Sequence, residues 1–187
     1  MAGSYHLNPH KDLRKLGRVA LVELDSSSTS LQAPSDVTRA LFLAIQKKQL
    51  FSLTMIARSD PVWRAIEDDV ESLQKLRQLA AMREGFNSNA LLVGSITEYQ
   101  PYPRMVLGLR LKMWDLTDGT LLWWVEQVWD SADRTIQKRI KTYSQQEIRS
   151  GYTPLREEMV AVSSLEFAKF AAYEVAETLD YDRRQPR

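Results

Sequence analysis

The sequence predicts one α/β domain in which helices pack on a mixed sheet of about five strands. Hydrophobic residues make up 44% and charged residues 26% of the 187 positions, a balance typical of globular proteins that bury a core. The length is only slightly above the roughly 150 residues of one average domain. Apolar residues recur at helical spacing in some segments and alternate in others, and these segments follow one another in the order β-α-β-α-β-β-β-α-α.

Strands alternate with helices in the N-terminal half. Residues 1–16 are expected to be a flexible lead-in. Residues 19–24 are rich in branched apolar side chains and predict a buried strand, and residues 51–56 alternate apolar with small polar side chains and predict a second one. Between them, residues 35–49 have the spacing of an amphipathic helix with Ser35 as its N-cap.

A long second helix is predicted next, and its N-cap is left open between two residues. Ser59 or Asp60 would cap it, with Pro61 in the first turn. Apolar side chains then recur at helical spacing from Val62 to about Arg83, which predicts one continuous amphipathic helix.

An antiparallel meander is predicted in the second half, with strands at residues 90–99, 105–114 and 121–129. The loop between the last two strands contains Asp118-Gly119, a strong hairpin signal that leaves two pairings open. A two-residue turn would place Leu111 opposite Glu126 and would mix apolar with charged side chains on both faces.

A three-residue loop that ends at Gly119 in the left-handed region pairs Arg110 with Glu126 and Met113 with Trp123. We favour this register because it separates the apolar set from the charged set. The predicted apolar face is Met105, Leu107, Leu109, Leu111, Met113, Leu121, Trp123 and Val125. The predicted opposite face is Gly108, Arg110, Lys112, Trp114, Leu122, Trp124, Glu126 and Val128.

The opposite face mixes tryptophan with cations, a composition that is also found in protein interfaces. We expect the C-terminal helices to cover this face, because apolar patches of that size are rarely left open. The alternative is that the face contacts a partner protein.

The domain is expected to span residues 17–187 and to end in a helical extension, residues 130–187. A polar, basic helix follows the third meander strand, and Gly151 and Pro154 interrupt the pattern after it. Ser163 caps the last predicted helix, which carries an apolar stripe.

No residue pattern points to catalysis, and we expect the chain not to be an enzyme. Cysteine is absent, which excludes disulfides, thiolate nucleophiles and zinc ribbons. The two imidazoles, His6 and His10, lie in the lead-in without a third ligand nearby in sequence, so we expect no metal site and no cofactor. The formal net charge of +1 provides no general attraction to nucleic acid, and we expect no nucleic-acid partner.

Three stretches carry a resemblance to a known family. They are Asn89-Ala90-Leu91-Leu92-Val93-Gly94-Ser95-Ile96-Thr97-Glu98-Tyr99, Leu109-Arg110-Leu111-Lys112-Met113-Trp114-Asp115 and Thr117-Asp118-Gly119-Thr120-Leu121-Leu122-Trp123. From about Leu16 to Asp130 the chain resembles the bacterial envelope family of the curli secretion channel lipoprotein, and it is similar also to the penicillin-binding-protein activator lipoproteins and the TolB amino-terminal-like domain. The resemblance implies a non-enzymatic, lipid-anchored periplasmic module of the anticodon-binding-like α/β fold that binds proteins or forms rings.

We therefore expect a protein-binding adaptor of the cell envelope, periplasmic and reaching a membrane only through a lipid anchor, that acts as a monomer or small oligomer on another envelope protein. The alternative is the periplasmic ring component of a curli-type secretion channel. The native gene is expected to encode an N-terminal extension with a lipidated cysteine just before about Ser4. The candidate partner-binding residues are Tyr102, Arg104, Arg110, Lys112, Trp114, Trp124 and Glu126.

Overall fold

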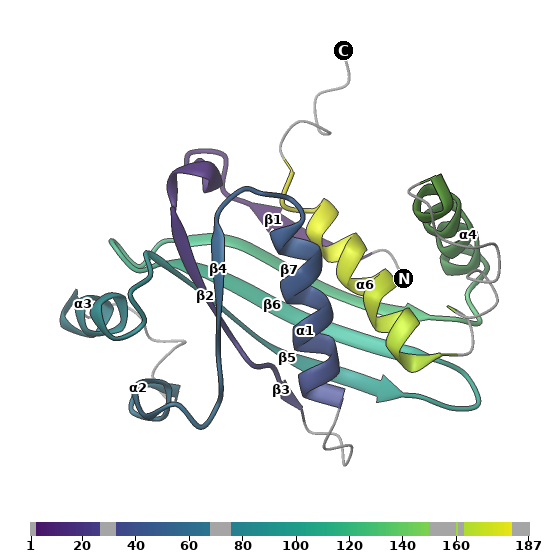
Figure 1. Cartoon of the computed structure of the whole chain (residues 1–187), viewed down its shortest axis with the longest axis horizontal. Coiled ribbons are helices and arrows are strands. Elements are labelled where there is room, and N and C mark those ends of the chain that lie inside the picture. Colours follow the sequence, from purple (N-terminus) through teal and green to yellow (C-terminus); the bar gives the residue numbers. More distant parts are fainter. Residues whose placement is uncertain (1–2, 27–32, 68–75, 150–159, 161–162, 181–187) are drawn as a thin grey trace.

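The computed structural model describes residues 3–26, 33–67, 76–149, 160 and 163–180. A seven-stranded mixed sheet carries helices on both faces, which confirms the predicted α/β class (Figure 1). The sheet runs in the order β1-β7-β6-β5-β2-β4, and β3 pairs with β5 off this path. The strands are β1 (Ser4–Leu7), β2 (Arg18–Val22), β3 (Asp25–Ser26), β4 (Ser52–Ile56), β5 (Ala90–Gln100), β6 (Val106–Asp115) and β7 (Leu121–Asp130).

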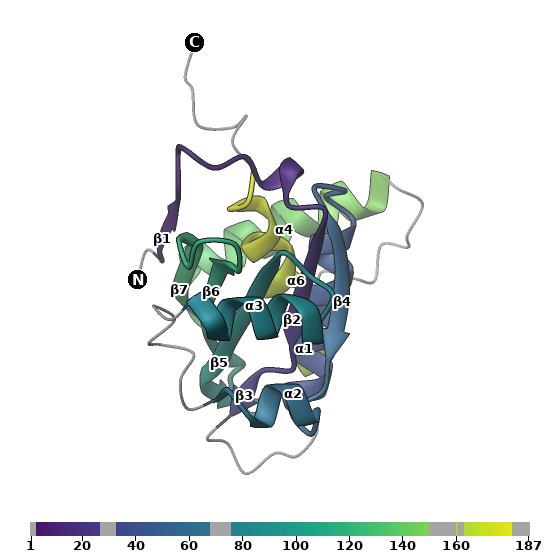
Figure 2. The ribbon, with the colours of Figure 1, turned by 90° about the vertical axis from the view of Figure 1, so that its left-hand side faces the viewer.

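The described helices form two layers. A short 3-10 helix η1 precedes β2, α1 and α6 lie side by side on one face of the sheet, and α2 and α3 lie on the other (Figures 1 and 2). The first core cluster joins α1, α4 and α6 to the sheet, and a smaller second cluster joins α2 and α3 to β2 and β5. The helices are η1 (Leu13–Lys15), α1 (Ala33–Gln46), α2 (Pro61–Arg64), α3 (Leu76–Gly85), α4 (Arg134–Arg149) and α6 (Ser164–Glu177).

Strand β2 is covered on both faces, which explains its apolar run. It pairs in parallel with β4 on one side and with β5 on the other. Its residues Val19 to Val22 are essentially inaccessible to solvent. A parallel strand between two helical layers needs apolar side chains in both directions, so a continuous run of them is expected rather than alternation.

The predicted meander register is confirmed. Arg110 lies opposite Glu126 and Met113 lies opposite Trp123. Gly119 has φ +75°, the left-handed conformation predicted for it. The loop itself has four residues, Leu116 to Gly119, and not the predicted three, because the Asp115 N–H bonds the Thr120 carbonyl and Trp114 pairs with Leu121. The turn is closed by a hydrogen bond from the Gly119 N–H to the Asp115 carbonyl at 2.8 Å.

The predicted faces need one correction, at the start of β7. Leu121 was assigned to the apolar face and Leu122 to the opposite one, but Leu122 is fully buried with the first core cluster and Leu121 is only half-buried. The pairing register shifts here, because Trp114 pairs with Leu121 while Met113 already pairs with Trp123. Leu122 is the extra residue of a β-bulge, which alternation alone cannot detect.

The expectation of a flexible lead-in was wrong for the residues that the structure describes. Ser4–Leu7 forms strand β1, which pairs antiparallel with β7. Leu7 is buried, and Leu13 of η1 is buried as well. A strand at this place pairs the backbone edge that β7 would otherwise expose, so the lead-in gains hydrogen bonds that no local pattern reveals.

The predicted second helix is not continuous. Asp60, one of the two N-cap alternatives, caps α2 by accepting from the Val62 and Trp63 N–H groups, but α2 ends at Arg64. The Ile66 N–H bonds the Trp63 carbonyl in a tighter turn, so the helix is interrupted directly after α2. Residues 68–75 of the predicted helix lie outside the described residues, as do the predicted interruptions at Gly151 and Pro154.

Two helix starts were predicted with different success. Ser163 caps α6 as expected, its side chain accepting from the Glu166 N–H. Helix α1 begins at Ala33, two residues before the predicted cap Ser35. Asp36 still lies in its first turn, where a carboxylate favours the helix dipole.

Candidate functional site

The candidate site lies on the face of β1, β7 and β6 that is turned away from α1 and α6, and we call it the mixed face. Cross-strand pairs define its rows, because paired residues of an antiparallel sheet point to the same side. His6, Trp124 and Lys112 form one row, and Ser4, Glu126 and Arg110 form the next. The mixed face consists of Ser4, His6, Gly108, Arg110, Lys112, Trp124, Glu126 and Val128.

An ion pair crosses the centre of the mixed face. Arg110 Nη2 lies 2.7 Å from Glu126 Oε1, and the two side chains are 54% and 49% exposed. The hydrogen bond from Arg110, with a smaller contribution from the charge of Lys112, lowers the pKa of Glu126. A pair this exposed stabilises the fold by at most about 1 kcal/mol, so both charges can be rearranged by a partner at little cost.

An aromatic side chain lies beside this pair. Trp124 is half-buried, and its neighbours in the row are the exposed His6 and the half-buried Lys112. Val128, one row beyond the ion pair, is 38% exposed. The face therefore combines a tryptophan, a branched apolar side chain and paired charges, which is the composition of many protein-binding surfaces.

The C-terminal helices do not cover the mixed face, contrary to expectation. Helices α4 and α6 contribute Ile140 and Phe170 to the first core cluster, which lies on the other side of the sheet. Helices α2 and α3 pack on the second cluster beneath β2 and β5. The expectation failed because α4 and α6 cover the apolar face of the meander, where the first core cluster lies.

Trp114 does not belong to the mixed face in practice. It is half-buried and packs against the second core cluster, together with residues of α3 such as Leu79 and Met82. Its side chain therefore stabilises the α3 layer. The prediction grouped it with Trp124 by alternation, which does not show which helix lies above each end of a strand.

The predicted loop residues lie at the end of the β5–β6 hairpin. Tyr102 is 83% exposed and is followed by a cis peptide bond to Pro103. Arg104 pairs with Asp130 at 2.8 Å, at the end of β7. Six residues separate Arg104 from Arg110, or about 20 Å of extended chain, so the loop and the ion pair are distinct surfaces.

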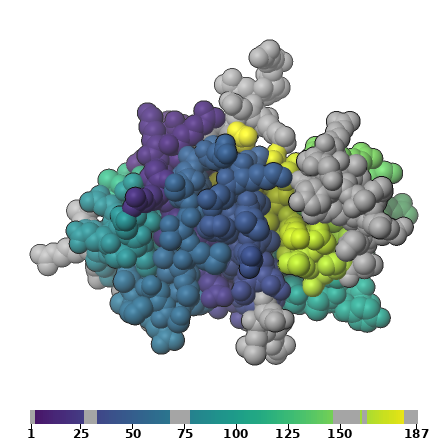
Figure 3. All heavy atoms as spheres, viewed as in Figure 1, coloured from purple at the N-terminus to yellow at the C-terminus, as the bar shows by residue number. Residues whose placement is uncertain are grey.

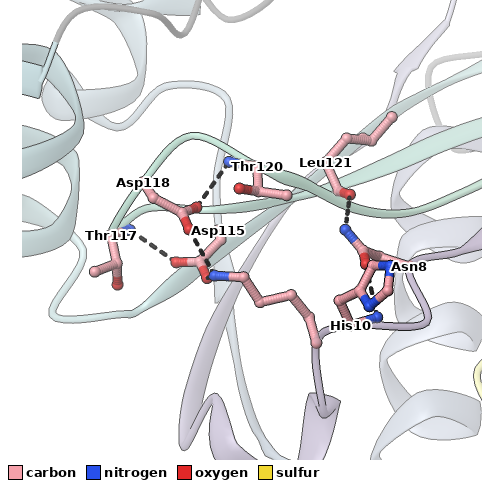
Figure 4. A network of polar contacts seen from close by, with 8 residues as sticks. Asn8, His10, Asp115, Thr117, Asp118, Thr120 and Leu121 are labelled. Atoms are coloured by element: carbon pink, nitrogen blue, oxygen red, sulfur yellow. Dashed lines mark hydrogen bonds and ion pairs between the residues drawn. The ribbon is translucent and has the colours of Figure 1, made fainter.

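A polar network that sequence reasoning missed fastens the N-terminal segment to the β6–β7 turn (Figure 4). Lys11 Nζ lies 2.9 Å from Asp115 Oδ2 and 2.6 Å from Asp118 Oδ2. Asp115 also accepts from the Thr117 N–H, and Asp118 accepts from the Thr120 N–H. Lys11 is separated from Asp115 by 104 positions, so no local signal points to this contact.

The same network shifts the pKa values of Asp118 and Lys11. The hydrogen bond from Lys11, assisted by the Thr120 N–H, lowers the pKa of Asp118 to about 2. The bonds to Asp118 and Asp115 raise the pKa of Lys11. Both shifts stabilise the charged forms, which is what a structural clamp requires and not what a proton-transferring pair needs.

A groove lies between α1 and α6 on the opposite face from the mixed face, where these two helices meet (Figure 3). Its volume is about 740 Å³, and it contains two exposed leucines, Leu43 and Leu165. Two of its lining residues, Lys48 and Glu177, form an ion pair. Its described lining residues include no serine, threonine, cysteine or histidine.

The described part of the chain contains no group of three or more histidine, aspartate or glutamate side chains placed to hold a metal ion. Among its helices, none combines the length and the apolar character needed to cross a membrane.

Comparison with known proteins finds similar folds but no family. No family model and no curated protein matches the chain. The PelC dodecamer from Paraburkholderia phytofirmans is 11% identical over 69% of this chain and 80% of its own, with a TM-score of 0.50. The hypothetical protein CT253 from Chlamydia trachomatis is 11% identical over 89% and 97%, with a TM-score of 0.51.

A third structure is similar at a lower score. Lipoprotein GNA1162 from Neisseria meningitidis is 11% identical over 73% of this chain and 99% of its own, with a TM-score of 0.45. At these identities, the likeness to PelC and CT253 shows a shared α/β fold and does not extend to a role.

Proposed function

We propose that this chain is a non-enzymatic, protein-binding adaptor of the bacterial cell envelope, held in the periplasm by a lipid anchor. The observation that carries the proposal is the mixed face, where Trp124 and an exposed ion pair lie side by side and the described helices pack elsewhere. The partner is another envelope protein. The resemblance of the meander sequence to envelope lipoproteins supports the compartment.

The mixed face suits a protein partner for a physical reason. Binding energy at interfaces is concentrated in a few aromatic and arginine side chains surrounded by polar groups. Trp124 and Arg110 are of these types, and they lie in adjacent rows of β6 and β7. The strands fix the backbone positions of both residues, so no backbone segment has to be ordered on binding.

Site-specific photo-crosslinking in the native bacterium tests the proposal. A photoreactive phenylalanine analogue placed at Arg110 or Lys112 is expected to yield the same adduct with one envelope protein. The matched control is Arg39, which is exposed on α1 on the other side of the sheet. With the probe at Lys112, Glu126→Arg, which opposes Arg110 with a like charge, should weaken the adduct without changing the free energy of unfolding by more than about 1 kcal/mol. Adducts from Arg39 alone, or none from either face position, would refute the assignment.

The alternative is a ring component of a secretion apparatus, favoured by the dodecamer in which PelC was solved. A ring needs a heterologous contact that closes on itself, whereas an adaptor can act as a monomer or small oligomer. Native mass spectrometry of the purified chain separates the two. We expect a monomer or small oligomer, and a closed assembly of eight or more copies would favour the ring.

A further inference from the structure

Helix α4 carries a concentration of positive charge that the adaptor function does not use. Between Arg134 and Gln146 its sequence contains four basic residues and no acidic one. Arg139 is neutralised by Glu174 of α6, which accepts from its Nε at 2.7 Å. The other three, Arg134, Lys138 and Lys141, are exposed, and none forms an ion pair with another described residue.

The three exposed cations lie on one side of the helix, and we call them the basic stripe. Successive residues of an α-helix are rotated by about 100°, so positions 134, 138 and 141 fall within an arc of about 60°. The buried residues Ile136 and Ile140 lie on the opposite side of the helix. The basic stripe therefore points directly away from the core and into solvent.

The polypeptide enters the sheet beside α4. Gly3, immediately before β1, lies against the side chain of Gln127 on β7. With its amide oxygen turned toward α4, Gln127 accepts a hydrogen bond from Arg139 Nη2 at 2.8 Å. A lipid anchor ahead of Gly3, which the proposed function includes, would hold the start of the sheet and α4 close to the same bilayer.

We propose that the basic stripe binds the anionic headgroups of a phospholipid membrane and so orients the anchored domain. The inference rests on the proposed function only for the anchor that brings α4 to the bilayer. A basic residue near an anionic membrane surface contributes roughly a five-fold increase in partitioning, so three contribute on the order of 100-fold. The formal charge of the whole chain is only +1, so a local stripe rather than a general attraction must supply this effect.

Vesicle partitioning of the full chain tests the inference without the native anchor. The vesicles are phosphatidylcholine alone, or phosphatidylcholine with about a third of phosphatidylglycerol, in buffer of low ionic strength. The stripe variant is Arg134→Gln, Lys138→Gln and Lys141→Gln. The matched control is Lys15→Gln, Arg64→Gln and Arg83→Gln, which removes three exposed cations from other elements. Each variant lowers the formal charge from +1 by three, to −2, so net charge is equal in the two.

The wild type and the control are expected to prefer the anionic vesicles, and the stripe variant is expected to lose between 10- and 100-fold of that partitioning. Salt at 0.5 M should release the wild type, because exposed charges are screened. Equal losses in the two variants, or no preference for anionic vesicles, would overturn the inference. Stripe-dependent binding to polyglutamate that matches binding to the vesicles would assign the stripe to an acidic protein and would also overturn it. None of these results depends on the crosslinking pattern of the mixed face, so the two proposals can fail separately.

Discussion

Replacing Trp123 by alanine should lower the free energy of unfolding by about 4 kcal/mol, whereas the same change at Trp124 should lower it by about 2 kcal/mol. The two residues are neighbours on β7 and differ in the face they occupy. Trp123 is fully buried between β7 and α6, and its indole Nε1–H donates to Thr178 Oγ1 at 3.0 Å. Trp124 is half-buried on the mixed face.

The magnitude follows from the area that each side chain buries. A buried tryptophan removes roughly 150–250 Å² from water, which at about 25 cal/mol per Å² amounts to roughly 4–6 kcal/mol. Its hydrogen bond adds about 1 kcal/mol, and partial collapse of the cavity recovers some of the loss. Trp124 is more exposed than Trp123 and leaves no closed cavity, so its truncation costs less.

Urea unfolding followed by circular dichroism measures the difference. With a slope of about 2 kcal/mol per M, W123A should shift the midpoint by about 2 M and W124A by about 1 M. If W123A does not fold, W123F keeps an aromatic ring but loses part of the indole and its hydrogen bond, and it should cost about 2 kcal/mol. Equal, large losses for W123A and W124A would mean that both faces of β7 are buried, which would remove the mixed face as a binding surface.

The remaining predictions concern the turn, the clamp and the α4 contact. Gly119→Val should cost about 1–2 kcal/mol because of the positive φ, and Gly119→Asn should cost less; urea midpoints give both values. Because the pKa of Asp118 is lowered in the folded protein, this carboxylate stabilises the fold above pH 4, and its contribution is lost as the pH falls from about 4 toward 2. Its side chain is 44% exposed, so we expect it to contribute less than about 1 kcal/mol to the free energy of unfolding. Lys11→Met should flatten that part of a stability-against-pH curve, and an unchanged curve would contradict the clamp. Glu174→Ala should cost about 1–2 kcal/mol and should speed hydrogen exchange in α4, because it removes the acceptor of the Arg139 Nε–H and the 2.6 Å bond from the buried Trp129 indole N–H, which then depends on Gln127 Oε1 at 3.0 Å.

Part of the candidate site could be predicted because it depends on local rules. The alternation of β6 and β7, together with the left-handed position of Gly119, fixes the register, and the register places Arg110 beside Glu126 and Lys112 beside Trp124. The loop residues Tyr102 and Arg104 are exposed as a proline-rich turn suggests. These features involve residues that are close in sequence or joined by one short hairpin.

The amino-acid order by itself determined the α/β class, five of the strands and the register of the meander, because periodicity and turn chemistry act over a few residues. Only the tertiary structure decided which helices cover which face. An apolar stripe requires a cover but does not specify its source, so the position of α4 and α6, and the packing of Trp114 under α3, could not be derived. Strand β1 and the Lys11 clamp also depend on contacts between residues more than 100 positions apart. Such contacts stabilise the protein only after folding has placed the two segments side by side, so no local sequence pattern predicts them.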